Sequence, residues 1–212
     1  AKHGEEILRH MNSREETVQT YGKMTGEIQD TFEQEAFDPQ QDGIRYSSDI
    51  RSMTGFYKQL GLMKSLAREE NYEIPIEIDG SLTAINLKVI HNEQEEGRVA
   101  ITFTSEPFGK TAAEFRLTEQ GLSGYCTCEK EAGKALLEEH KAEWQEQLVK
   151  EGIQPGAVYF TNTNSLNLKD FNKNQTKEQK SGSKADSVQL YRAAKAFIAF
   201  VRQTGDTERK SI

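Results

Sequence analysis

Apolar and polar residues alternate through the middle of the chain with the period of two that is typical of half-buried strands. Two such sets are Ile74, Ile76 and Ile78, and then Ile85, Leu87 and Val89. Between them stands Asp79-Gly80, a dipeptide that tolerates the positive φ angles of a two-residue hairpin turn. The pattern predicts a β-hairpin.

The alternation resumes after a polar turn over residues 92–97. Three further runs carry it: Val99, Ile101 and Phe103; Ala113, Phe115 and Leu117; and Leu122, Gly124, Cys126 and Cys128. Gln120-Gly121 supplies a turn between the last two runs. Because the runs and their connections are short, we expect an antiparallel meander from Glu73 to Cys128.

From Glu129 the period becomes that of a helix. Leu137, His140, Trp144 and Leu148 recur at intervals of three and four. This predicts one amphipathic helix that packs across the sheet, with Trp144 in the core. Gly152 and Pro155 end the helix, and the apolar residues that follow predict a strand returning to the sheet.

Helical spacing also appears at both ends of the chain. Ser13 and Glu16 have the spacing of a capping box before a partly apolar helix, and a second helix is expected after the break at residues 38–43. Near the C-terminus, Leu190 and Phe197 belong to a broad apolar face. We expect this last helix to fold back on the domain, the alternative being docking into a groove of a partner.

These patterns predict an α+β fold in which an antiparallel β meander has a helix packed across it, with helices before and after. The expected parts are an N-terminal helical region over 1–70, an α+β domain over 71–162, a polar linker over 163–186, and a C-terminal helix and tail over 187–212. The linker is rich in Asn, Lys, Gln, Ser and Gly, so we expect it to be flexible.

Composition narrows the class of partner. Hydrophobic residues make up 35% of the 212 residues, the mean hydropathy is -0.76 and the formal net charge is -7. No basic cluster is interleaved with aromatic residues, which argues against nucleic acid as a partner. No run is long enough to span a membrane and no signal peptide opens the chain, so we expect a cytoplasmic protein without membrane insertion. A start at Ala1 rather than Met fits a fragment of a longer protein.

Candidate chemical groups are few. Cys126 and Cys128 lie on one strand face about 7 Å apart, near the limit for a disulfide, and packed free thiols are the simpler expectation. A zinc site would need His91 and His140 as well, at a spacing that matches no standard finger. A cysteine-dependent enzyme with His140 as base is an alternative, although His140 shares a stripe with apolar residues.

No glycine-rich phosphate loop, nucleophile elbow or zinc-protease motif occurs, so we expect no catalytic, metal or cofactor site. Trp144 and Tyr125 are candidate interface anchors, but a lone Trp on a helix stripe is more often part of the core.

The order of elements between Arg98 and Thr161 resembles a known family. The matching segments are Ser105-Glu106-Pro107-Phe108-Gly109 before a strand, Ala113-Glu114-Phe115-Arg116-Leu117, the helix with Leu136-Leu137 and Trp144 to Leu148, and Gly152-Ile153-Gln154-Pro155-Gly156. This stretch, about a third of the chain, is similar to the C-terminal domain of the bacterial flagellar hook-length control protein. That domain is the substrate-specificity switch of type III export.

The resemblance implies a protein-protein interaction module, not an enzyme, that switches export specificity by contacting the cytoplasmic domain of the export-gate protein. It also implies a cytoplasmic location or export through the flagellar type III apparatus. The alternative is a structural or adaptor domain of the same fold with another partner.

In that family a proline, two spacers and then Leu-Gly begin the first of these strands, and the motif is implicated in the gate contact. Here Pro107 is directly followed by Phe108 and Gly109. A rigid proline and a permissive glycine could present the aromatic ring to a partner, so these three residues are the expected partner-binding site. The alternative is that Phe108 caps the core beneath the helix.

Overall fold

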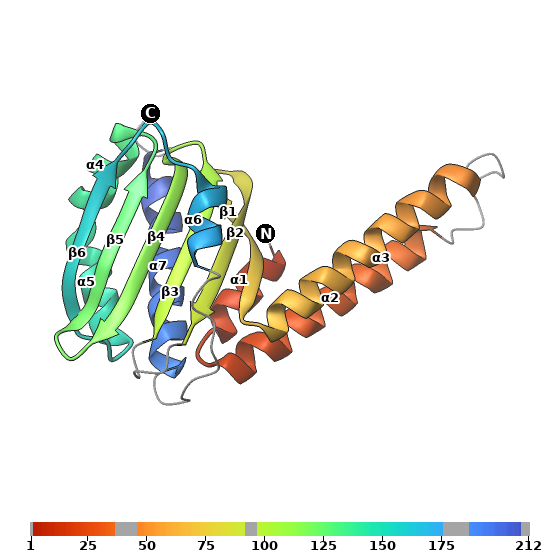
Figure 1. Cartoon of the computed structure of the whole chain (residues 1–212), viewed down its shortest axis with the longest axis horizontal. Coiled ribbons are helices and arrows are strands. Elements are labelled where there is room, and N and C mark those ends of the chain that lie inside the picture. The colour runs from red at the N-terminus through yellow and green to blue at the C-terminus, as the bar shows by residue number, and fades with distance from the viewer. Residues whose placement is uncertain (1, 37–45, 92–96, 176–186, 209–212) are drawn as a thin grey trace.

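The computed structural model describes residues 2–36, 46–91, 97–175 and 187–208. The fold is α+β and is built on a six-stranded sheet with the order β1-β2-β3-β4-β5-β6 (Figure 1). The strands are β1 Asn71–Ile78, β2 Ser81–Ile90, β3 Arg98–Ser105, β4 Gly109–Thr118, β5 Gly121–Cys128 and β6 Pro155–Asn162. The helices are α1 Lys2–His10, α2 Arg14–Ala36, α3 Tyr46–Arg68, α4 Glu131–Glu139, α5 Lys141–Lys150, α6 Leu168–Asn174 and α7 Ser187–Glu208.

The predicted meander is confirmed. Strands β1 to β5 pair antiparallel in sequence order. Ile78 pairs with Ser81 across the predicted turn, where Asp79 and Gly80 have φ angles of 51° and 71°. Two successive positive φ values give the mirror-image turn that matches the twist of paired strands. Strand β6 then adds in parallel to β5, after the crossover through α4 and α5.

The crossover contains two helices where the sequence predicted one. His140 leaves the helical conformation, with φ -95° and ψ 10°, and separates α4 from α5. Its carbonyl accepts the N–H groups of Glu143 and Trp144, which starts the hydrogen-bond ladder of α5. The apolar stripe continues through the break, since Leu137 and Trp144 are both buried, and so its period does not reveal the break.

Helix α5 ends as its sequence predicts. Gly152 has φ 76°, and the N–H of Ile153 donates to the carbonyl of Leu148 at 2.8 Å while Gly152 N–H donates to Val149. This pair of bonds is the Schellman motif, and its accompanying apolar contact is present because Leu148 and Ile153 are both buried. The chain then enters β6 at Pro155.

The core lies between one face of the sheet and helices α4, α5 and α7 (Figure 1). Trp144 is fully buried; its ring stacks on Phe200 at 5.6 Å between centroids and lies 5.3 Å from Phe115 on β4. Leu190 and Phe197 of α7 are also fully buried. The predictions that Trp144 belongs to the core and that the last helix folds back are therefore confirmed.

The opposite face of the sheet is covered in part by α6. Asn167 caps this short helix by accepting the N–H groups of Lys169 and Asp170, and Gln175 at its end donates to Glu114 of β4 at 2.8 Å. Residues 163–175 of the predicted linker thus include an ordered helix, which the polar composition concealed. The rest of that linker, 176–186, lies outside the described residues.

Helices α2 and α3 form a hairpin that projects from the sheet, and we call it the helical arm (Figure 1). Its start carries part of the predicted capping box, since Glu16 N–H donates to Ser13 Oγ at 3.2 Å. Helix α1 packs against β1, where a side chain in place of Gly4 would collide with the carbonyl of Pro75.

A buried polar cluster joins the arm to the sheet and to α7. Glu70 accepts hydrogen bonds from Tyr191 at 2.9 Å and lies 2.8 Å from His91 Nε2 and 3.6 Å from Arg14 Nε. The hydroxyls of Tyr72 and Tyr191 lie 2.8 Å apart. We call these five residues the Glu70 cluster. Glu70 is only 8% exposed and has φ 56°, so the cluster holds a non-glycine residue in the left-handed region.

Electrostatics in the Glu70 cluster follow from burial and contact. Burial alone would raise the pKa of Glu70, but His91, the Tyr191 hydroxyl and Arg14 together hold that pKa below its ordinary value. Burial raises the pKa of Tyr72 to about 12, and it also raises the pKa of Tyr191. Both tyrosines therefore remain neutral hydrogen-bond donors at physiological pH.

Candidate interaction surface

The three residues expected to bind a partner lie in the turn between β3 and β4. Pro107, Phe108 and Gly109 are all buried there, and Phe108 is fully inaccessible. Its ring makes an edge-to-face contact with Phe103 at 6.2 Å, and Gly133 of α4 and Gly205 of α7 lie against it. The ring therefore caps the core beneath the helices, and the expectation that it is exposed to a partner does not match this arrangement.

Gly109 has φ +67°, which fits the expected permissive role of glycine at this turn. Polar side chains close over the turn. The Glu129 carboxylate accepts the Lys110 N–H at 3.1 Å, and Lys130 Nζ donates to the carbonyl and carboxylate of Glu106. These charged groups, and not the phenyl ring, form the outside of the turn.

The two thiols face the core. Cys126 and Cys128 are free and fully buried, and the hydrogen bond to Cys128 together with burial raises the pKa of Cys126 well above its usual value. A neutral thiol of this kind is a weak nucleophile. His140, the candidate base, instead has its Nδ1 2.9 Å from Glu143 on the surface of α5.

The other candidate zinc donor, His91, belongs to the Glu70 cluster. Across the described ranges, no group of three or more His, Cys, Asp or Glu residues is arranged to hold a metal ion. The four residues considered for zinc are thus engaged in other contacts.

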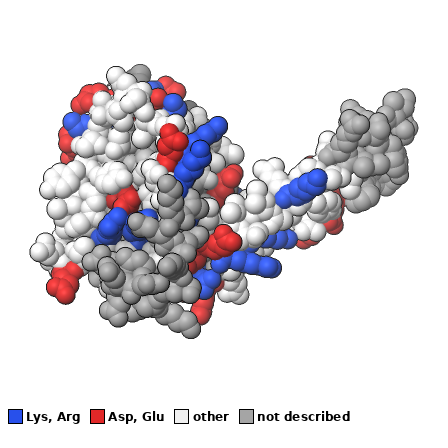
Figure 2. Space-filling model, viewed as in Figure 1, with Lys and Arg blue, Asp and Glu red and all other residues white. Residues whose placement is uncertain are grey.

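The sheet face that points away from the core helices is uncharged over β5 and β6. Its residues are Ser123, Tyr125, Thr127, Ala157, Tyr159 and Thr161, and we call them the tyrosine face. Figure 2, which views this side of the sheet, shows a mainly uncharged area over these strands with charged groups around it. Tyr125 is 39% exposed and Tyr159 is 66% exposed.

Pairing of the strands aligns the tyrosine face. Tyr125 is the direct neighbour of Tyr159 in the parallel register, and the hydroxyls of Thr127 and Thr161 lie 2.8 Å apart. The two tyrosines thus occupy neighbouring positions on rigid strands, and their side chains lose little conformational freedom on binding. Burial raises the pKa of Tyr125, so its hydroxyl remains protonated.

Strand β4 bounds the tyrosine face with an ion pair. Arg116 lies 3.0 Å from Glu114, and Gln175 at the end of α6 binds the same carboxylate. On the other side, β6 is the last strand of the sheet. Lys141 Nζ donates to the carbonyl of Val158 in β6 at 2.7 Å, which covers one backbone acceptor at this edge. The face is therefore a bounded patch with an uncharged centre and a charged group at its rim.

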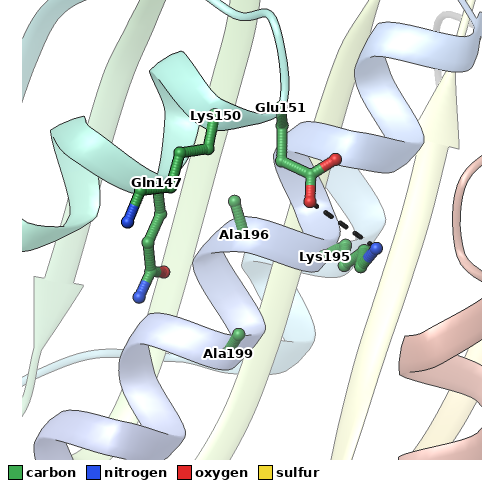
Figure 3. Close-up of a pocket in the computed structure, with 6 residues that line it drawn as sticks. All are labelled: Gln147, Lys150, Glu151, Lys195, Ala196 and Ala199. Carbon is green, nitrogen blue, oxygen red and sulfur yellow. Dashed lines mark ion pairs between the residues drawn. The ribbon is translucent and has the colours of Figure 1, made fainter.

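A hollow lies on the opposite side of the molecule from the tyrosine face, between α5 and α7 (Figure 3). It has a volume of about 200 Å³, and Ala196 and Ala199 leave it open because their side chains are short. Lys195 lines it, but its Nζ is 3.6 Å from Glu151 and donates to Asn12 at 2.9 Å. Lys195 and Glu151 are thus paired with each other, which makes this hollow a weaker candidate than the tyrosine face.

Part of the tyrosine face can be predicted from the sequence. Tyr125 is a candidate interface anchor in the sequence. The period of two places it on the strand face opposite to that of Cys126 and Cys128. The strand predicted after Pro155 includes Tyr159, but only the burial of Val158 and Phe160 establishes that Tyr159 is on the exposed face. The parallel register that pairs Tyr125 with Tyr159 depends on the crossover and has no local signal.

The chain matches no protein-family model, no curated protein and no solved structure. In the part of the chain that the structure describes, none of the helices has the length and apolar character needed to cross a membrane.

Proposed function

We propose that this protein is a protein-protein interaction module that binds its partner through the tyrosine face. The observation that carries the proposal is that Tyr125 and Tyr159 are exposed and occupy paired positions of β5 and β6 on an uncharged area of the sheet. Tyrosine is enriched among the residues that dominate binding energy, and charged residues are depleted at interface centres. The ion pair of Glu114 and Arg116 supplies the polar rim.

The partner we propose is the cytoplasmic domain of the flagellar export gate, and the function is a switch of export specificity. This rests on the resemblance of residues 98–161 to the hook-length control C-terminal domain. The order of elements from β3 through α4 and α5 to β6 agrees with the order on which that resemblance depends. Burial of Phe108 moves the proposed contact from the turn to the tyrosine face.

Titration calorimetry of the full chain against the purified gate domain tests both the proposed binding site and the proposed partner. Tyr159→Ser and Tyr125→Ser should each weaken binding roughly tenfold or more, which corresponds to about 1.4 kcal/mol. Because both rings are exposed, the free energy of unfolding should change by only about 0.5 kcal/mol. Val149→Ser is the matched control, since Val149 is 61% exposed but lies on α5, away from this face.

The possible failures are distinguishable. Binding by the parent that both tyrosine variants retain would disprove the site but keep the partner. No binding by the parent would disprove the gate as partner, and a structural or adaptor role for the same face would replace the switch. That adaptor role predicts that other captured proteins lose binding to Tyr159→Ser but not to Val149→Ser.

A further inference from the structure

Charges on the helical arm are segregated by helix. From residue 24 to residue 35, α2 carries four carboxylates and no cation: Glu27, Asp30, Glu33 and Glu35. From residue 52 to residue 68, α3 carries three cations and no carboxylate: Lys58, Lys64 and Arg68. One helix of the hairpin is thus acidic over this range and the other is basic.

The two sets of charge do not neutralise each other within the hairpin. Each of two side-chain contacts between α2 and α3 joins a charged group to a neutral one: Tyr57 donates to Glu33 at 2.7 Å, and Lys64 donates to Gln29 at 3.3 Å. Among the described residues, no ion pair joins α2 to α3. Asp30, Glu35 and Lys58 all point into solvent.

The apolar seam of the arm is also only half covered. Phe32 and Phe56 stack at 3.9 Å, yet both rings are partly exposed. Among the described side chains beyond Leu60 toward the tip of the arm, none that is apolar is fully buried. Two helices cover each other on one side, whereas a four-helix bundle encloses the apolar positions of every helix.

The charges are also ordered along the arm. Asp30, Glu33 and Glu35 lie in the half of α2 that approaches the tip, while Lys64 and Arg68 lie in the half of α3 that meets the sheet. The arm projects from the sheet (Figure 1), and the side chains of Asp30, Glu35, Lys64 and Arg68 are exposed. If two arms lie antiparallel, the acidic part of each α2 meets the basic part of the other α3.

We propose that two copies of this chain associate through their helical arms, which pack antiparallel and complete a four-helix bundle. The occupant is a second copy because a single arm carries both members of the complementary charge pattern. A two-fold axis across the middle of the paired arms then produces the contact between α2 of one copy and α3 of the other twice, as an isologous interface requires. The seam around Phe32 and Phe56 becomes the bundle core.

Analytical ultracentrifugation of the full chain over a wide concentration range tests the association. The parent should show a concentration-dependent monomer-dimer equilibrium that weakens with added salt. The double variants Asp30→Lys with Glu35→Lys, and Lys58→Glu with Lys64→Glu, should each dimerise roughly tenfold or more weakly, because every substitution occurs twice in the interface. Glu77→Lys, an exposed reversal on β1, should leave the equilibrium unchanged.

Mixing the two double variants gives the decisive measurement. In the mixture, the lysines introduced on α2 of one variant face the glutamates introduced on α3 of the other, so a heterodimer should form although each variant alone dimerises poorly. Circular dichroism confirms that both variants remain folded. Three results would overturn the proposal. The parent could be monomeric at every concentration, the dimer could be insensitive to the charge reversals, or the mixture could fail to associate.

Discussion

At the scale of single residues, Phe108 shows how burial decides between two roles for an aromatic side chain. The ring fills a space between Phe103 and the glycines of α4 and α7. Phe108→Ala should lower the free energy of unfolding by about 3 to 5 kcal/mol, because a fully buried ring leaves a cavity. Urea unfolding followed by tryptophan fluorescence measures this loss.

Tyr159→Ala provides the contrast for Phe108, since its ring is 66% exposed and should change stability little. Equal effects of the two substitutions on stability would contradict the assignment of Phe108 to the core.

The carboxylate of Glu70 makes stability depend on pH. Its folded-state pKa is lowered, so the unfolded chain binds this proton more readily, and the stabilisation is present above the unfolded pKa and lost as pH falls through the folded pKa. Glu70→Gln should reduce stability at neutral pH, because an amide is a weaker partner for His91 and Arg14. In this variant the free energy of unfolding should also fall less steeply as the pH drops below about 4.5.

Urea unfolding of the parent and of Glu70→Gln across the acidic range checks this expectation. The difference in unfolding free energy between the two proteins should shrink as pH falls. A constant difference from neutral pH to acid would show that the Glu70 carboxylate does not titrate with unfolding.

At the scale of elements, glycines distinguish the arm from the core. A Cβ added at Gly55 on α3 would meet no described atom within 4 Å, whereas one at Gly133 on α4 would press on Phe108 and the carbonyl of Pro107. Gly55→Ala should stabilise the protein by about 0.5 to 1 kcal/mol through helix propensity. Gly133→Ala should destabilise it, and thermal unfolding of both variants measures the difference in sign.

Local patterns in the sequence predict those elements whose residues signal their own conformation. Asp79-Gly80 specifies the first hairpin, and the period of α7 specifies its buried face. The break at His140 has no such signal because the apolar stripe runs through it. Asn167 caps α6 inside a polar stretch whose composition suggested a flexible chain.

Features that depend on distant parts of the chain could not be predicted in this way. Tyr125 is paired with Tyr159 because the crossover adds β6 in parallel, and Phe108 is buried because α4 and α7 both lie over its ring. Long-range packing thus buries the turn at Phe108 and leaves the tyrosine face exposed.

At the scale of the whole molecule, α7 unites the fold. It contacts strands β1 to β4 and helices α2, α4 and α5, and Tyr191 ties it to the Glu70 cluster. Ending the chain at residue 186 should therefore leave Trp144 and Phe115 uncovered, so that the truncated protein loses its near-ultraviolet circular dichroism and aggregates.

Adding a peptide of residues 187–212 to the truncated chain should restore that signal, because the missing helix supplies apolar contacts without new covalent bonds. A truncated chain that keeps native fluorescence and does not bind the peptide would show that α7 is dispensable for the core.

Because α7 follows all six strands in the sequence, it also determines when the sheet can become native during synthesis. Tyr72 and Tyr191 are separated by 119 residues, so the ribosome releases one side of this contact long before the other. Until the last helix emerges, the sheet presents its apolar face to the surrounding solution, where nascent chains are prone to aggregate. Closure over such sequence separation slows folding, because the loop entropy is lost before the contacts form. The late arrival of α7 thus gives the nascent chain an interval without native structure, during which chaperones can bind the uncovered sheet.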